Sequence, residues 1–157
     1  MVEIGIAQKD DLEEIVRDLW YNLAKEREDD HKYNELAEDG LIENSITHKK
    51  ELVNRSDSEI YAAKEDGEIV GYISFKVADR PPIFKIKKNI SVSELFVKES
   101  HRGKSIGKDL MSKAEEFAES NDCEVMSLSV DLPNEGAFGF YQHLGFEQFR
   151  RKLAKDL

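Results

Sequence analysis

The chain has 157 residues, of which 36% are charged and 39% are hydrophobic, and its net charge is −10. This length fits one domain over residues 1–157 with one sizeable core. No apolar run reaches the roughly 18 residues that a membrane span needs, and the negative charge argues against nucleic-acid binding. Cys123 is the only cysteine, so no intrachain disulfide can form, and we expect a reducing, cytoplasmic environment.

The N-terminal third predicts one strand and two helical regions. Apolar and polar residues alternate over residues 2–7, which indicates a strand. Apolar side chains then recur at helical spacing over residues 8–27, where Asp10 or Asp11 can cap the helix. After a charged break, residues 33–54 predict a second helical region, which Gly40 would divide in two.

From residue 59 the hydrophobic period changes from that of a helix to that of a strand. Residues 60–64 and 69–77 predict two strands, and the sequence Glu65-Asp66-Gly67-Glu68 between them indicates a hairpin. Arg80-Pro81-Pro82 breaks the pattern, and residues 84–97 predict one or two further strand segments.

The C-terminal third predicts a helix over residues 102–121, a strand over 124–130, a short helix over 133–144 and a last strand over 146–153. The whole order is β-α-α-β-β-β-α-β-α-β. It predicts the α/β class, as a mixed α+β sheet with helices on its faces. The sheet should be antiparallel in the middle and parallel where a helix joins two strands.

The segment 93–107 runs from an extended stretch, through a glycine-flanked basic loop, into an amphipathic helix. The first amides of such a helix are unpaired and lie at its positive end, and Arg102, Lys104 and Lys108 add charge nearby. This predicts a site for phosphate, of which a pyrophosphate fits best. An ordinary turn followed by a solvated helix explains the same residues, and neither a P-loop nor a Gly-x-Gly-x-x-Gly fingerprint is present.

Two motifs in this part of the chain resemble those of the GNAT superfamily of N-acetyltransferases. Arg102-Gly103-Lys104-Ser105-Ile106-Gly107 is similar to the family loop Gln/Arg-x-x-Gly-x-Gly/Ala, with Ser105 where the first motif glycine is usual. Asn134, Ala137 and Tyr141, followed by Gly145-Phe146, match the family pattern Asn-x-x-Ala-x-x-x-Tyr with a later Gly-Phe. On these motifs and the order of elements, the chain is identified as a member of that superfamily.

The resemblance implies a GNAT-like fold with splayed central strands and acetyl-CoA as the co-substrate, without a metal. Backbone groups of the loop would hold the CoA pyrophosphate, and the strand before it would pair with the pantetheine arm. Asn134 would bond the pantetheine, and Tyr141 would lie near the thioester. The cofactor contacts implied are Leu95, Phe96, Val97, Arg102, Gly103, Lys104, Ser105, Ile106, Gly107, Lys108, Asn134 and Tyr141.

Acetyl transfer to an amine requires a neutral nitrogen and a proton for the departing thiolate. Tyr141 is our candidate acid, and its alternative role is that of a packed residue in a short helix. Glu94 is our candidate base, and its alternative is an exposed strand carboxylate. Other relatives place a Glu on the following strand, where this chain has Ser129, with Asp131 two residues on as a second candidate.

The family's acceptor pocket is usually formed by the first two helices, which here carry many carboxylates. They would attract a cationic amine such as a polyamine, an aminoglycoside or a lysine side chain, although solvated helix ends explain them equally. The acidic residues are Glu26, Glu28, Asp29, Asp30, Glu35, Glu38 and Asp39.

We therefore expect an N-acetyltransferase that moves an acetyl group from acetyl-CoA to a primary amine by direct attack. The amine would belong to a small cationic molecule or to a protein or peptide. The alternative is a catalytically weak acyl-CoA-binding sensor or interaction protein of the same fold, which Ser105 and Ser129 favour. Many relatives dimerise through the last strand region, residues 146–153 here, so a homodimer is a further expectation.

Overall fold

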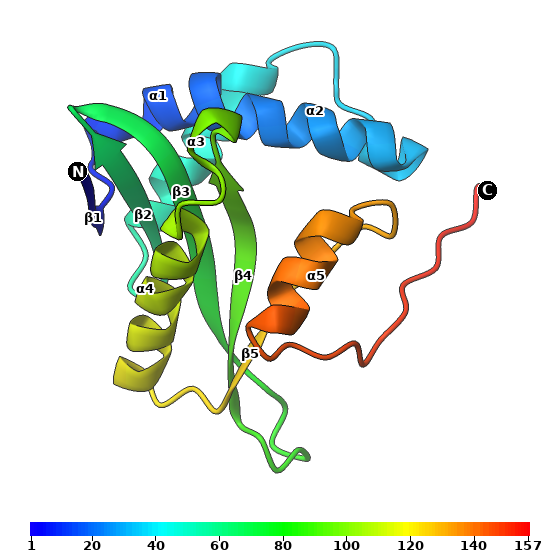
Figure 1. The fold of residues 1–157 in the computed structure, drawn as a ribbon. Helices are drawn as coiled ribbons and strands as arrows, with labels where there is room; N and C mark the ends of the chain where they lie inside the picture. The colour runs from blue at the N-terminus through cyan, green and yellow to red at the C-terminus, as the bar shows by residue number, and fades with distance from the viewer.

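The chain forms five strands and five helices, in an order close to the one that the sequence predicts (Figure 1). The computed structural model describes all 157 residues. The strands are β1 (Val2–Ile6), β2 (Ser58–Glu65), β3 (Glu68–Asp79), β4 (Lys88–Val97) and β5 (Val125–Ser127). The helices are α1 (Leu12–Glu14), α2 (Tyr21–Asp30), α3 (Leu41–Val53), α4 (Ile106–Ser120) and α5 (Glu135–His143). A π-helical segment, Ile15–Trp20, joins α1 to α2.

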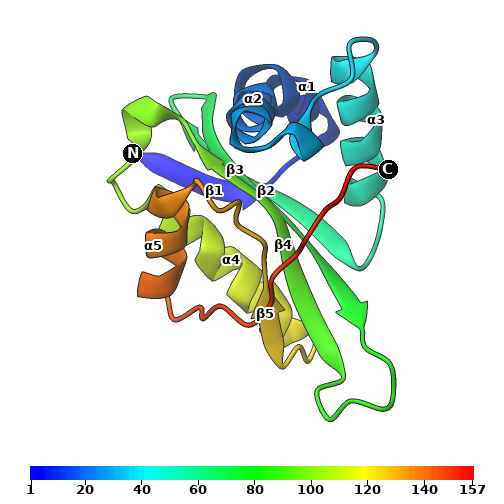
Figure 2. The ribbon, with the colours of Figure 1, turned by 90° about the vertical axis from the view of Figure 1, so that its right-hand side faces the viewer.

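The strands form one sheet in the order β1-β2-β3-β4-β5. Each pair of neighbours from β1 to β4 is antiparallel, and β5 runs parallel to β4. Helices α1, α2 and α3 cover one face, and α4 and α5 cover the other (Figure 2). The predicted fold class is confirmed, because a parallel pair appears where helix α4 connects two strands. None of the helices combines the length and the hydrophobicity that a membrane-spanning helix requires.

Two predicted turns are confirmed by the backbone. Asp66 and Gly67 form the two-residue loop between β2 and β3, and both have positive φ, 51° and 82°. This is the geometry that hairpins with Asp-Gly adopt. Gly40 has φ 69° and immediately precedes α3, so the predicted interruption is present. Of the helical region predicted before Gly40, only a 3-10 turn over Lys32–Asn34 forms.

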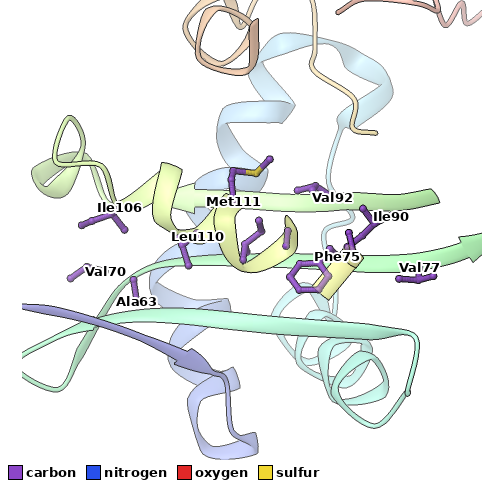
Figure 3. Packing of buried hydrophobic residues seen from close by; sticks show 12 residues of the cluster. Ala63, Val70, Phe75, Val77, Ile90, Val92, Ile106, Leu110 and Met111 are labelled. Atoms are coloured by element: carbon purple, nitrogen blue, oxygen red, sulfur yellow. The ribbon is translucent and has the colours of Figure 1, made fainter. Parts of the chain in front are cut away.

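A hydrophobic core lies on each face of the sheet. On one face, α4 packs Ile106, Leu110 and Met111 onto buried residues of the middle strands (Figure 3). On the other face, Leu12, Ile15 and other residues of the first helical region cover the buried face of β2 and β3. The sheet is therefore held from both sides, and its strands keep fixed positions beneath the loops that follow them.

The sheet opens between β4 and β5. Only Asn89, Ile90 and Ser91 of β4 face partners in β5. The register between β3 and β4 also shifts just beyond this point, where Ser74 faces Glu94 but Phe75 faces Val92. The extra residue, Ser93, is a β-bulge, and such bulges bend a strand and end its pairing. The expected splay of the central strands is thus present.

The strand predicted over residues 146–153 is absent, and this prediction was wrong. No helix or strand follows α5. Phe149 and Leu153 are 73% and 91% exposed. No strand forms because the run Arg150-Arg151-Lys152 breaks the alternation of apolar and polar residues, and because β5 is too short to supply a partner edge. The tail runs instead across the molecule to the turn that follows α2, where Asp156 pairs with Lys32 (Figure 1).

Candidate active site

The loop before α4 presents a row of unpaired backbone amides. Gly103 has φ 76° and Ser105 has φ 67°, so the chain turns twice through the left-handed region before the helix begins at Ile106. This turn explains why α4 starts four residues later than predicted. The Asp109 amide is the first to find a partner, the Ser105 carbonyl at 3.0 Å. The amides of residues 103–108 have none, which is the anion-binding arrangement of a helix N-terminus.

The Arg102 side chain braces this loop. Its guanidinium lies 3.4 Å from a carboxylate oxygen of Glu26 and 5.2 Å from the centre of the Phe96 ring. It therefore ties α2 to the end of β4. Lys104 and Lys108 make no ion pair, so these two side chains are the ones available to an anion held by the amides.

Beyond its short pairing with β5, the outer edge of β4 has no strand partner. The Lys98 amide donates to the Val70 carbonyl of β3 at 2.8 Å. Because backbone groups alternate between the two edges of a strand, Leu95 and Val97 turn theirs outward, whereas Phe96 pairs with β3. Of the three strand residues predicted to contact pantetheine, only Leu95 and Val97 therefore present backbone groups at the open edge.

Two arginines cap carbonyl groups along this open edge. Arg27 Nη2 donates to the Ser93 carbonyl at 3.4 Å, and Arg102 Nε donates to the Val97 carbonyl at 2.8 Å. Leu95 lies between the two capped positions. Its amide and carbonyl are thus the groups best placed to bond an extended chain that enters the splay.

Helix α5 lies close to the start of α4. A Cβ atom on Gly107 would lie 3.4 Å from Phe140, in ordinary van der Waals contact, so the two helices are neighbours at this point. Asn134 caps α5, because its Oδ1 accepts the Ala137 amide at 3.1 Å. The amide nitrogen of Asn134 remains as a donor for the predicted pantetheine contact.

Tyr141 is half-buried beside the open edge. Its ring packs edge-on against Phe140 and Phe146, with centroids 5.2 and 5.7 Å apart. Its hydroxyl has no hydrogen-bond partner within the protein. Burial raises the pKa of Tyr141 above its ordinary value of 10, so the hydroxyl keeps its proton at neutral pH. The packed role is therefore observed, and the acid role stays a prediction, for which the hydroxyl keeps a proton that no protein group accepts.

Glu94 is not the exposed carboxylate that was one reading of the sequence. It points to the face covered by α3 and is 16% exposed. Its Oε1 lies 2.9 Å from Lys49 Nζ, 3.2 Å from the Tyr72 hydroxyl and 3.5 Å from the Ser74 hydroxyl. Burial and the Glu94 charge raise the pKa of Tyr72 well above its ordinary value, so this phenol acts as a donor.

Sequence reasoning missed Lys49, although the sequence holds a signal for it. Ile42, Ser45, Ile46 and Lys49 recur at helical spacing on the face of α3 that the protein covers. A lysine in the buried phase of an amphipathic helix requires a partner, because an isolated buried ammonium is costly. A carboxylate on a neighbouring strand was therefore predictable, although its identity was not.

The acidic residues of the first helices serve different purposes. Glu28 pairs with Lys25 at 2.7 Å, and Glu26 pairs with Arg102, so these two are structural. Asp30 lies beside Asp131, and its pKa is raised by burial and by that neighbouring charge. Asn34, next to this pair, donates to Asp131 at 2.9 Å.

Ser129 lies beyond β5, is exposed, and makes no side-chain hydrogen bond. Of the two alternative positions for a base, Ser129 and Asp131, only Asp131 lies beside another acidic residue, Asp30. Glu35, Glu38 and Asp39 lie exposed in or near the turn before α3 and form no ion pair. The structure therefore brings Asp30 and Asp131 together and leaves most of the predicted acidic set to solvent or to ion pairs.

The sequence model of the Acetyltransferase (GNAT) family matches residues 10–146, which contain every site residue described above. The chain belongs to the GNAT family. It is thus an acyltransferase.

Relatives support the same membership. An uncharacterized N-acetyltransferase of Archaeoglobus fulgidus is 34% identical over 140 residues, which cover 89% of each protein. The N-alpha-acetyltransferase MAK3 of Arabidopsis thaliana is 29% identical over 91 residues, which cover 58% of this chain and 46% of that protein. A Methanocaldococcus jannaschii N-acetyltransferase is likewise matched over only 43% of its length.

Among solved structures, the aminoglycoside N-acetyltransferase AAC(6')-Iy in complex with CoA is similar in fold. Its TM-score is 0.78 at 18% sequence identity, and the match covers 100% of this GNAT chain and 95% of the other. At this identity the likeness concerns the fold alone.

Proposed function

We propose that this GNAT protein transfers an acetyl group from acetyl-CoA to a primary amine by direct attack. The observation that carries the proposal is the row of unpaired amides in residues 103–108, which ends at the open edge of β4. The amides, with Lys104 and Lys108, would hold the CoA pyrophosphate. Leu95 would bond the pantetheine, with Val97 beside it, and Asn134 would add one donor.

The reaction requires three proton transfers. Glu94 would first accept a proton from the acceptor ammonium, which leaves a neutral amine. The amine nitrogen then forms a bond to the thioester carbonyl carbon while the carbon–sulfur bond breaks. Tyr141 would give its proton to the departing thiolate, which its raised pKa permits only through close positioning. The second proton lost by the nitrogen would return to Tyr141, so that the amide product is neutral and the phenol is restored.

We further propose a cationic acceptor. The pair Asp30 and Asp131 offers negative charge beside the splay, and the chain carries a net charge of −10. Both a small polyamine and a peptide amine fit this field. Of the proteins named above, one similar in fold is named an aminoglycoside N-acetyltransferase, and MAK3 is named an N-alpha-acetyltransferase. A cytoplasmic location and a homodimer through the exposed tail after α5 also remain proposals.

A second candidate is an acyl-CoA-binding sensor without turnover. Two observations favour it: Ser105 occupies a left-handed position where the family motif has glycine, and Ser129 cannot act as a strong base. The sensor would bind CoA through the same loop. The two candidates therefore differ in turnover and agree in binding.

The test is a thiol-release assay with acetyl-CoA and spermidine, neamine, L-lysine and a peptide with a free N-terminus. We expect one or more of these amines to react, and Tyr141→Phe to lower kcat by about 10²-fold or more while CoA affinity by calorimetry stays the same. Tight CoA binding without turnover of any amine would favour the sensor. Full activity in Tyr141→Phe would refute the acid role, and no CoA binding would refute both candidates.

A further inference from the structure

Lys49 is a buried cation that the family motifs do not include. Its side chain is 1% exposed in the middle of α3. Its ammonium lies 5.3 Å from the Trp20 ring centre and 5.8 Å from that of Tyr72, which adds cation–π attraction. Glu94 is its only carboxylate partner, at 2.9 Å. Burying an ammonium in this way is costly unless the pairing geometry is good, so the position is a demanding one for a lysine.

The two oxygens of Glu94 are unequally used. Oε1 accepts from Lys49, Tyr72 and Ser74, which come from two different elements, α3 and β3. Oε2 has no partner in the protein. Since Oε1 is saturated and the side chain retains some exposure, Oε2 is the oxygen available to another molecule.

The position of Glu94 in the sheet matches this use. It lies three residues beyond Ser91, the last residue of β4 that pairs with β5, and next to the bulge at Ser93. Ser74 of β3 lies directly opposite Glu94 in the register of the two strands. The bulge and the splay therefore fall at the same point of β4 as the carboxylate.

We propose that Lys49 is a positioning residue, which with Tyr72 and Ser74 holds one oxygen of Glu94 and directs the other to the acceptor amine. This rests on the proposed function. The free oxygen first bonds the ammonium of the acceptor and then takes its proton, so that the neutral amine attacks while the carboxylate becomes a carboxylic acid. The charged or titratable groups that contact Glu94 are Lys49 of α3 and Tyr72 of β3, and the charge of Arg27 of α2 acts on Tyr72.

The first test needs no acceptor. The carboxyl carbon of Glu94, assigned by its loss in Glu94→Gln, is titrated by NMR in the wild type, Lys49→Met and Tyr72→Phe. Removing a cation beside a carboxylate makes proton release harder, so in Lys49→Met we expect the midpoint to rise by about one pH unit or more. Tyr72→Phe removes only one hydroxyl, and we expect a smaller rise. An unchanged midpoint in both variants would overturn the proposal.

The second test measures catalysis with whichever of spermidine, neamine, L-lysine and the peptide reacts. Lys49→Met should lower kcat/KM at least tenfold, move the acidic limb of its pH profile upward, and leave CoA affinity within twofold. The amine titrates identically in every reaction, so a displaced limb reports on the protein. In a Glu94→Gln background, Lys49→Met should cause no further loss.

Other outcomes separate the possible failures. If CoA affinity falls in parallel with kcat, or if the loss is as large without Glu94 as with it, Lys49 is merely structural and the proposal fails. Should Lys49→Met not fold, Tyr72→Phe and Ser74→Ala must show the smaller shifts, and their absence would overturn it. If no amine reacts but the NMR midpoint moves, the electrostatic arrangement holds and the proposed function is at fault.

Discussion

Replacing Ser105 by glycine is expected to stabilise the protein slightly. Ser105 has φ 67° and ψ 9°, in the left-handed region, immediately before α4. A serine at this place in a helix usually contributes a capping hydrogen bond, but the Ser105 side chain makes none. The substitution therefore removes a strained side chain without removing a contact.

The magnitude follows from two opposing effects. A non-glycine residue in this region costs roughly 1–2 kcal/mol. Glycine loses about 0.5–1 kcal/mol more backbone entropy on folding. The free energy of unfolding should therefore rise by about 0.5–1 kcal/mol. For a domain of this size, 1 kcal/mol corresponds to a change in Tm of about 2–4 °C.

Gly103 is the matched control. It has φ 76°, and a Cβ atom added there would meet nothing within 4 Å, so Gly103→Ala introduces backbone strain alone. We expect this variant to lose about 1 kcal/mol of unfolding free energy and to weaken CoA binding, because the amides turn away. Chemical denaturation and calorimetry measure both effects. A harmless Gly103→Ala, or a Ser105→Gly that destabilises by 1 kcal/mol, would contradict the left-handed loop.

Three further predictions concern other parts of the site. Asn134→Ala should cost about 1 kcal/mol of stability, because the Ala137 amide loses its cap, whereas Asn134→Asp should retain it, as denaturation curves would show. The pKa of Asp30 is raised, so the favourable contribution of this side chain to stability exists below its ordinary pKa and is lost as pH rises. Asp30→Asn should therefore not lower the Tm at pH 7. The same substitution should raise the KM of a cationic amine. Activity should fall at alkaline pH only above 10, where Tyr141 loses its proton, and this limb should vanish from the residual activity of Tyr141→Phe.

The fold was largely predictable because its signals are local. The period-two pattern, the Asp66-Gly67 turn and the amphipathic stripe of α4 each depend on neighbouring residues, and each appears in the structure. The last strand failed for the opposite reason. A strand needs a partner edge, and nothing in residues 146–153 reveals that β5 ends after three residues.

The site was predictable where a motif carries it and hidden where it depends on tertiary pairing. The loop before α4, with its free amides, and the motif that contains Tyr141 are each short continuous segments, so the spacing of their residues suffices to find them. The partners of Glu94 do not, because Lys49 is 45 positions earlier and Ser74 is 20 earlier in the sequence. Only the register of β3 against β4, and the placement of α3 over that face, bring them together.

The alternation of β4 gives the proposed reaction its geometry. Glu94 and Leu95 are adjacent, so their side chains lie on opposite faces of the sheet. Leu95 and Tyr141 both pack against the core on the face of α4 and α5, whereas Glu94 points toward α3. At an ordinary paired position this alternation would separate two cores. Where β5 has departed, the backbone edge between those faces is open, and a thioester held along it would meet a proton donor from one face and a proton acceptor from the other. An amine that enters from the α3 face would approach the thioester carbonyl carbon from one side of its plane, which is the approach that acyl transfer requires.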